Sequence, residues 1–225
     1  SNVSHELKTP LTAIMGFIET INGPAKNDVE QKEKFLKIIQ VEAERMQRLV
    51  NDTLSLTRVE ESEYQTPNER VSLWYCANSA CDSVQTLADK KNIKISFQKE
   101  YQKDEFFIKG NADQITEVFE NLLDNAITYS KDDTNITIAF SEKEENIEFK
   151  IIDQGHGIPK DDIVRVSERF FRSKTANMYK KNSSGLGLAI VKHIINRHAG
   201  SLLIESTEGK GSTFTITLPK FPASS

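Results

Sequence analysis

The amino-acid sequence predicts an α+β fold in two parts, a helical hairpin followed by an α/β sandwich in which helices cover one face of a mixed sheet. Two observations lead to this prediction. Over the first 59 positions, apolar residues recur at alternating intervals of three and four, which is typical of helices packed along a seam. Over the remaining chain, helical patterns are interspersed with short apolar runs typical of strands.

The first part, residues 1–62, contains two helical patterns. The apolar seam of the first helix covers positions 7–21 and ends before Gly23 and Pro24, and that of the second helix covers positions 36–59. Two helices cannot enclose a core alone, whereas two hairpins related by a twofold axis form a four-helix bundle. We therefore expect a homodimer. The alternative is a hairpin that packs on the downstream domain of its own chain.

The second part begins after a polar stretch, residues 63–70, which contains Pro67 and is interpreted as a linker. We expect one domain over residues 71–220 and a tail at 221–225. The predicted strands cover 71–73, 93–97, 106–109, 136–140, 147–152, 201–206 and 213–218, and the predicted helices cover about 74–91, 112–129 and 186–198.

Composition argues against several classes of function. The formal net charge of -4 provides no broad basic field, so we expect no nucleic-acid partner. The sequence lacks a run of about 18 apolar residues, so we expect no membrane contact by this segment. Cys76 and Cys81 lie five apart in a helical pattern, a spacing that suits neither a zinc knuckle nor a disulfide framework.

His5 is the first candidate for chemistry. It lies two residues before Leu7, about 200° round the helix from the seam, and is expected to face water. The adjacent Glu6 can accept a proton from the imidazole, and Pro10 lacks the N–H that would bond the carbonyl of Glu6. A solvated surface histidine is the alternative interpretation.

Two further patterns suit a bound phosphate compound. Asn121 and Asn125 lie four apart on a predicted helix, so both amide oxygens can approach a hard cation, although solvated asparagines would show the same spacing. Asp153 directly follows an apolar strand and precedes two glycines that allow close approach of the backbone. In the segment 184–191, glycines lead straight into an apolar helix, whose first N–H groups can bind an anion.

These patterns together resemble one family. Ser4-His5-Glu6-Leu7-Lys8-Thr9-Pro10-Leu11 is closely similar to the phosphoacceptor box of sensor histidine kinases. The segments that resemble its nucleotide-binding boxes follow in the family's order at 117–126, 153–159, 169–172, 184–191 and 209–214. The resemblance implies a dimeric four-helix bundle followed by an ATP-binding domain of the gyrase, chaperone and histidine kinase type.

The resemblance also implies roles for individual residues. His5 would be the phosphoacceptor, Glu6 its acid/base partner and Thr9 a participant in phosphatase activity, while Asn121 and Asn125 would hold Mg²⁺. The implied ATP-binding residues are Asn121, Asn125, Tyr129, Asp153, Gly155, Gly157, Ile158, Phe170, Arg172, Gly185, Leu186, Gly187, Leu188 and Thr213. Residues 173–184 would form a lid over the nucleotide.

The implied function is ATP-dependent autophosphorylation, followed by transfer to an aspartate of a cognate response regulator, with phosphatase activity toward that regulator. The chain would be a cytoplasmic fragment of a bacterial plasma-membrane sensor, and segments 167–172 and 185–198 are most similar to the phosphate-regulon sensors. Thr128 and Ser183 depart from the family pattern, which often has Lys and Gly there. The alternatives are a clamp ATPase of the gyrase, chaperone and mismatch-repair superfamily and a non-catalytic dimerising scaffold.

Overall fold

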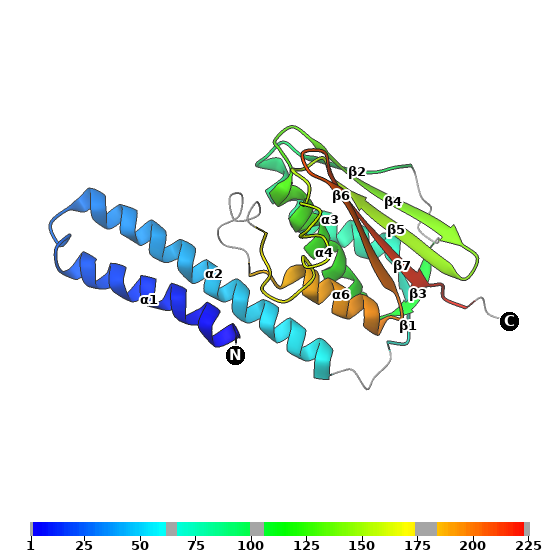
Figure 1. Ribbon diagram of the computed structural model, residues 1–225, viewed down its shortest axis with the longest axis horizontal. Coiled ribbons are helices and arrows are strands. Elements are labelled where there is room, and N and C mark those ends of the chain that lie inside the picture. Colours follow the sequence, from blue (N-terminus) through cyan, green and yellow to red (C-terminus); the bar gives the residue numbers. More distant parts are fainter. Residues whose placement is uncertain (1, 62–66, 100–105, 174–183, 223–225) are drawn as a thin grey trace.

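Two long helices, α1 (Asn2–Asn22) and α2 (Val29–Glu61), form the antiparallel hairpin that the apolar spacing predicts. A tight turn joins them, in which the backbone N–H of Gly23 donates to the carbonyl of Glu19 at 2.9 Å. The computed structural model describes residues 2–61, 67–99, 106–173 and 184–222. The hairpin projects from the second domain, with its turn at the far end (Figure 1).

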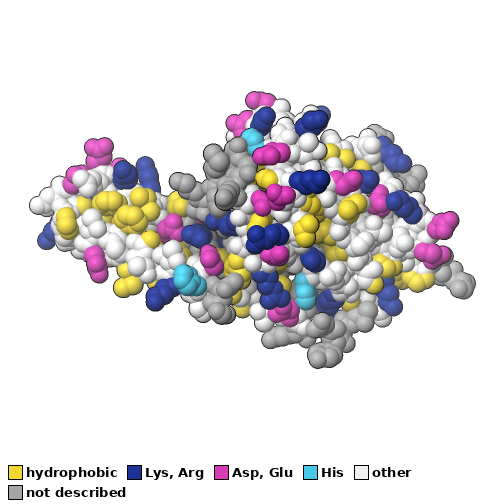
Figure 2. All heavy atoms as spheres, in the orientation of Figure 1, with side chains coloured by type: hydrophobic (Ala, Val, Ile, Leu, Met, Phe, Trp, Pro, Cys, Tyr) yellow, Lys and Arg dark blue, Asp and Glu magenta, His cyan; other side chains and the backbone are white. Residues whose placement is uncertain are grey.

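Apolar side chains remain uncovered along the hairpin. Met15 and Leu36 are 55% and 57% exposed, and Leu11 and Ile18 of the predicted seam are exposed as well. Figure 2 shows hydrophobic side chains gathered over this part of the molecule. A single chain therefore leaves the seam without a partner surface, which keeps the homodimer as a prediction.

The C-terminal turns of α2 pack on the second domain of the same chain. Leu56 is buried and belongs to the core of that domain, and α2 contacts the helix α6 (Gly187–Arg197). Ser55 donates a hydrogen bond to Glu117, and Glu60 forms an ion pair with Arg169. Packing on the downstream domain, which was the alternative to a dimer, is therefore found for this end of the hairpin.

The second domain is built on a five-stranded mixed sheet with the order β2-β4-β5-β7-β6, in which only the β2-β4 pair is parallel. The helices α3, α4 and α6 cover one face (Figure 1). The apolar core lies between these two layers. The elements are β1 (Glu69–Ser72), α3 (Leu73–Asp89), β2 (Lys94–Phe97), β3 (Phe107–Gly110), α4 (Ala112–Tyr129), β4 (Asn135–Lys143), β5 (Asn146–Ile152), α6 (Gly187–Arg197), β6 (Ser201–Thr207) and β7 (Gly211–Pro219).

The expectation of one sheet holding every strand is wrong for β1 and β3. These two strands form a separate two-stranded sheet, with Val71 opposite Ile108, and a single bridge joins Ile108 to Lys220, which follows β7. Both strands have four residues, and α3 begins directly after β1, so neither strand extends into a ladder with a strand of the main sheet. None of the helices in the described ranges combines the length and apolar character needed to cross a membrane.

Both ends of α4 are fixed by side chains from other segments. At its start, the Asn111 side chain accepts from the N–H of Gln114 at 2.9 Å, and the Asn111 N–H donates to Nε2 of His198 at 3.1 Å. At its end, the ammonium group of Lys91 donates to three carbonyls near the helix terminus, which carries negative partial charge. These carbonyls belong to Ile127 (3.0 Å), Thr128 (2.8 Å) and Ser130 (3.0 Å).

Candidate functional site

A cavity of about 510 Å³ lies between α4, the start of α6 and the ends of β5 and β7. Most of the residues predicted to bind ATP line it. These are Asn121, Asn125, Tyr129, Asp153, Gly157, Ile158, Arg172, Gly185, Gly187 and Leu188. Four predicted residues do not line it, namely Gly155, Phe170, Leu186 and Thr213.

Asp153 lies at the end of β5 and is 7% exposed. Its Oδ1 accepts from the backbone N–H groups of Gly155 at 2.8 Å and Ser212 at 3.1 Å. Burial raises the pKa of the Asp153 carboxyl, and these two hydrogen bonds oppose that increase. Because both bonds end on Oδ1, neither occupies Oδ2, which can accept from a ligand.

The glycines after Asp153 are required by close backbone contacts. Gly157 has φ of +69°, and a Cβ there would lie 2.2 Å from the carbonyl oxygen of Thr207. A Cβ at Gly155 would lie 2.6 Å from the carbonyl oxygen of Tyr129. Gly155 therefore packs the strand end against α4, which explains why it lies behind the cavity wall.

Asn121 presents its amide oxygen toward the start of α6. Its Nδ2 donates to the carbonyl of Glu117 at 2.9 Å, which fixes the orientation of the amide. A Cβ built on Gly187 would lie 2.7 Å from Oδ1 of Asn121. Asn125, one turn later on α4, lines the same cavity, together with the carboxylate of Asp124. The donor set is therefore rich in oxygen, which is what Mg²⁺ binds in proteins.

The start of α6 is built as an anion-binding turn. Gly185 has φ of +72°, and its carbonyl accepts from the N–H of Phe170 at 2.9 Å. Leu186 is 1% exposed and anchors the turn in the core, so it contributes backbone position and no cavity surface. Among the described residues, no side chain caps the first turn of α6, and its N–H groups stay available to an anion.

Phe170, Phe171 and Arg172 separate in the folded chain. All three line a second cavity, and Phe171 and Arg172 also line the nucleotide-sized cavity, whereas Phe170 packs against the core. The guanidinium of Arg165 lies 4.4 Å from the ring centroid of Phe171. Burial lowers the pKa of Arg172, and the nearby Tyr129 counters this effect.

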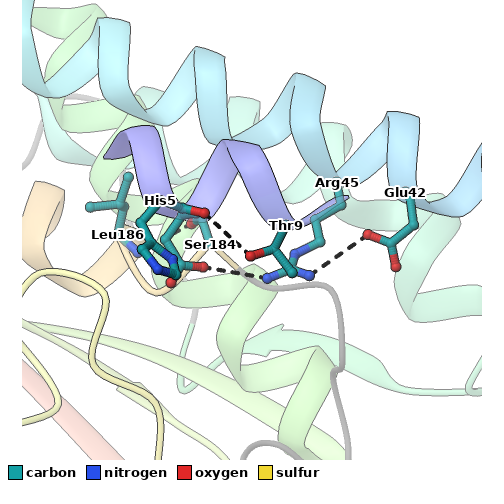
Figure 3. A network of polar contacts seen from close by, with 7 residues as sticks. His5, Thr9, Glu42, Arg45, Ser184 and Leu186 are labelled. Atoms are coloured by element: carbon teal, nitrogen blue, oxygen red, sulfur yellow. Dashed lines mark hydrogen bonds and ion pairs between the residues drawn. The ribbon is translucent and has the colours of Figure 1, made fainter. Parts of the chain in front are cut away.

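His5 is exposed, as its position off the seam predicts, and it opens onto the second cavity of about 610 Å³. Glu6 Oε2 lies 3.5 Å from Nη2 of Arg45 on α2. Arg45 also pairs with Glu42 at 3.7 Å (Figure 3). Thr9 donates to the backbone carbonyl of His5 at 3.3 Å. The carboxylate of Glu6 is therefore held by a side chain of the other hairpin helix, and both Glu6 and His5 line the second cavity.

Two family models match the chain. The model described as "His Kinase A (phospho-acceptor) domain" matches residues 1–62, and the one described as "Histidine kinase-, DNA gyrase B-, and HSP90-like ATPase" matches residues 110–222. The chain belongs to the sensor histidine kinases. The phosphoacceptor domain precedes the ATP-binding domain in this chain, so the predicted order of the two is confirmed.

Named relatives of this kinase include two sensor proteins. The sensor histidine kinase WalK of Bacillus subtilis is 35% identical over 221 residues, which are 97% of this chain and 36% of WalK. The phosphate regulon sensor protein PhoR of Pseudomonas aeruginosa is 35% identical over 215 residues, 96% of this chain and 48% of PhoR. The chain thus spans less than half the length of these relatives, and the two sensor groups resemble it equally in identity.

A solved structure with the same fold is that of the histidine kinase ThkA in complex with the response regulator protein TrrA. It superposes with a TM-score of 0.74 over 98% of this chain and 60% of that chain, at 22% identity. At this identity the likeness concerns the fold, and it extends over both the hairpin and the sandwich.

Several cavity residues of the kinase were missed from sequence. Arg48 and Asp52 of α2 and Ser83 and Val84 of α3 line the nucleotide-sized cavity, although none belongs to a recognisable box. Only tertiary packing brings them there, and no local pattern marks them. The missed residues of the boxes or their neighbours are Glu117, Glu120, Asp124, His156, Val166, Phe171, Ser173, Ser184, Ser212 and Phe214.

The cavity residue predicted from the last box is one position away from those that line the cavity. Thr213 was predicted, but its neighbours Ser212 and Phe214 line the cavity. Side chains alternate along β7, so a residue and its two neighbours point to opposite faces of the sheet. The predicted lid at 173–184 falls mostly on residues 174–183, which lie outside the described residues, as does Ser183.

Proposed function

We propose that this kinase binds ATP in the 510 Å³ cavity and transfers the γ-phosphoryl group to His5. The observation that carries the proposal is the combination of a buried acceptor, Asp153, and an uncapped helix start at α6 in one cavity, with an exposed histidine beside a carboxylate on α1. The family membership of both halves supports the same function.

Asp153 would recognise the adenine ring. Its Oδ2 accepts the hydrogen bond from the exocyclic amino group, while the backbone N–H groups of Gly155 and Ser212 hold Oδ1 in place. Gly157 and Ile158 line the cavity beside this acid and provide a close, partly apolar surface for a flat base. The other proposed contacts are Tyr129, Leu188 and Arg172.

The triphosphate would lie between α4 and the first turn of α6. The N–H groups at Gly187 and Leu188 suit phosphate oxygens, because they lie at the positive end of the helix dipole. Asn121 and Asn125 would hold Mg²⁺ through their amide oxygens, and the orientation of Asn121 toward Gly187 fits this role. When bound, the ion would neutralise negative charge on the phosphate oxygens.

The transfer step requires positioning more than covalent work by the protein. The lone pair of the unprotonated imidazole nitrogen of His5 attacks the γ-phosphorus, and a P–N bond forms. The bond from that phosphorus to the β,γ-bridging oxygen breaks, and ADP leaves with the electron pair. The proton on the other ring nitrogen passes to the carboxylate of Glu6, which Arg45 holds beside the histidine.

The partners we propose follow from the hairpin. Its exposed apolar seam, with Met15 and Leu36 more than half exposed, would be covered by a second copy in a homodimer. The phosphoryl group of His5 would pass to an aspartate of a cognate response regulator, and Thr9 would serve in the reverse, phosphatase reaction. ThkA, whose fold is similar, was crystallised with a response regulator. In the cell the chain would be the cytoplasmic part of a membrane-bound sensor.

The test incubates the chain with γ-labelled ATP and Mg²⁺, beside His5→Gln and the control His193→Gln. His193 lies on α6, away from both cavities, so its variant should behave as the parent. We expect acid-labile, alkali-stable label on the parent and on the control, and none on His5→Gln. ATP hydrolysis without protein-bound label would instead indicate a clamp ATPase, and nucleotide binding without hydrolysis would indicate a scaffold.

A further inference from the structure

We infer that phosphoryl transfer takes place within one chain, so that the nucleotide site of each chain serves its own His5. The inference rests on the proposed kinase activity and specifies its acceptor. It concerns a choice that the sequence leaves open, because the sequence does not indicate whether the histidine beside the nucleotide belongs to the same chain or to its dimer partner.

The two cavities of a single chain share a wall. The cavity at His5 is lined, on the hairpin side, by His5 and Glu6. On the other side it is lined by the segment 165–172 of the same chain, and Phe171 and Arg172 of this segment also line the nucleotide cavity. Two side chains of this chain, Phe171 and Arg172, thus lie between its nucleotide cavity and its His5.

Arg172 connects the two sites electrostatically. Its guanidinium is attracted by the carboxylate of Glu6, the neighbour of the acceptor, and repelled by Arg45, which pairs with Glu6. It also interacts with Tyr129 of α4, inside the nucleotide cavity. Arg172 lines both the nucleotide cavity and the cavity at His5. A cation in this position can stabilise negative charge on the phosphoryl group at either site.

The second domain is attached to its own hairpin at the level of His5. The antiparallel pairing places Glu6 beside Arg45, and Arg48 and Asp52, which follow on α2, line the nucleotide cavity. At 1.5 Å per residue, the distance along α2 from Arg45 to Asp52 is only about 10 Å. The nucleotide cavity therefore begins within two turns of α2 from Arg45, the residue that pairs with Glu6.

Three contacts keep this arrangement in place. Leu56 is buried in the core of the second domain, Ser55 donates to Glu117 on α4, and Glu60 pairs with Arg169. Arg169 itself belongs to the segment that faces His5. Apolar burial and polar contacts from one helix thus orient the segment 165–172 toward the histidine of the same chain.

The test uses dimers that combine two different inactive chains. One chain carries His5→Gln and keeps its nucleotide site, and the other carries Asp153→Asn and keeps its histidine. Each has a different tag, and mixed dimers are purified over both tags after co-expression. We expect no label on either chain after incubation with γ-labelled ATP and Mg²⁺. Label on the Asp153→Asn chain would overturn the inference, because only transfer between chains could place it there.

The control is a mixed dimer of the parent chain and Asp153→Asn. Label on the parent chain alone supports transfer within a chain and shows that a mixed dimer is active. Label on the Asp153→Asn chain again overturns the inference. Absence of label on both chains of this dimer, and on the dimer of two parent chains, would refute the proposed function itself and is thereby distinguished from failure of this inference.

If the two tags never co-purify, the rate of labelling per parent chain is measured across a hundredfold range of protein concentration. If sedimentation shows that the chain is a monomer over this range, a rate that is independent of concentration supports transfer within the chain. A rate that rises in proportion to concentration overturns it, because separate chains would then have to meet.

Discussion

Gly187 and Asn121 approach each other so closely that the glycine cannot carry a side chain without displacing the asparagine. A Cβ at Gly187 would lie 2.7 Å from Oδ1 of Asn121. Because this amide oxygen is oriented by the bond from Nδ2 to Glu117, it has little freedom to move away. The position of the Asn121 amide therefore depends on the absence of a side chain at Gly187.

We expect Gly187→Ala to weaken ATP binding about tenfold, which corresponds to about 1.4 kcal/mol. The methyl group forces the Asn121 amide away from its position at the start of α6. Titration calorimetry with ATP and Mg²⁺ measures the change. Gly16→Ala is the matched control, since a Cβ at Gly16 has nothing within 4 Å, and its affinity should equal that of the parent. Equal affinity for Gly187→Ala would contradict the assignment.

Arg45→Gln should slow labelling of His5 several-fold and leave the affinity for ATP unchanged. Arg45 holds the carboxylate of Glu6 at 3.5 Å, whereas a glutamine cannot form that ion pair. Initial rates of labelling, measured at saturating ATP, separate this effect from nucleotide binding. Lys37→Gln, at an exposed position of the same helix, should match the parent. A normal rate for Arg45→Gln would show that Glu6 needs no partner from α2.

Lys91→Met should lower the free energy of unfolding by about 1–3 kcal/mol, because hydrogen bonds to carbonyls at the end of α4 are lost. Chemical denaturation monitored by circular dichroism gives the value. Lys90→Met removes the same charge from the adjacent exposed position and should change stability by no more than about 0.5 kcal/mol. Similar losses for both variants would point to net charge as the cause.

The stability of the kinase should fall as the pH is lowered below about 6.5, the ordinary pKa of histidine. Burial lowers the pKa of His198, while its bond to the carbonyl of Ile194 opposes the shift and Arg197 adds to it. Since the pKa is lower in the folded state, the unfolded chain binds the proton first, and the free energy of unfolding decreases through this pH range. Protonation would also remove the acceptor for the N–H of Asn111.

Urea unfolding between pH 8 and pH 5.5 measures this dependence. His198→Gln should be less stable at pH 8 and should show a shallower decrease below pH 6.5 than the parent. His193→Gln provides the comparison, because it removes a histidine from the same helix. An unchanged slope in His198→Gln would assign the pH dependence to other groups.

Sequence reasoning predicted most of the fold because local signals were strong. The predicted helix at 112–129 agrees with α4 at both ends, since an asparagine cap precedes a regular apolar stripe. The pairing of β1 with β3 was not predicted, because two strands of four residues have no local feature that identifies their partner. Sheet membership of such short strands is decided by tertiary packing.

Some residues of the candidate site could be predicted from local sequence, and others could not. Asn121, Asp153 and Gly187 lie in boxes with characteristic neighbours and could be named from the sequence, and they line one cavity. Arg48 and Asp52 could not, because they enter the cavity only when the second domain packs on α2. Sequence patterns thus indicated what each box contributes, but they did not indicate which surface closes the space between the boxes.

The hydrogen bond from Ser212 to Asp153 has a consequence for the order of events during synthesis. The two residues are 59 positions apart, and β7 lies between β5 and β6 in the sheet. A ribosome that has released β5 and β6 has therefore not yet supplied the strand that joins them or the N–H that orients the carboxylate. Until residues 211–219 have emerged, the nascent chain therefore lacks both the strand between β5 and β6 and the N–H group that orients Asp153.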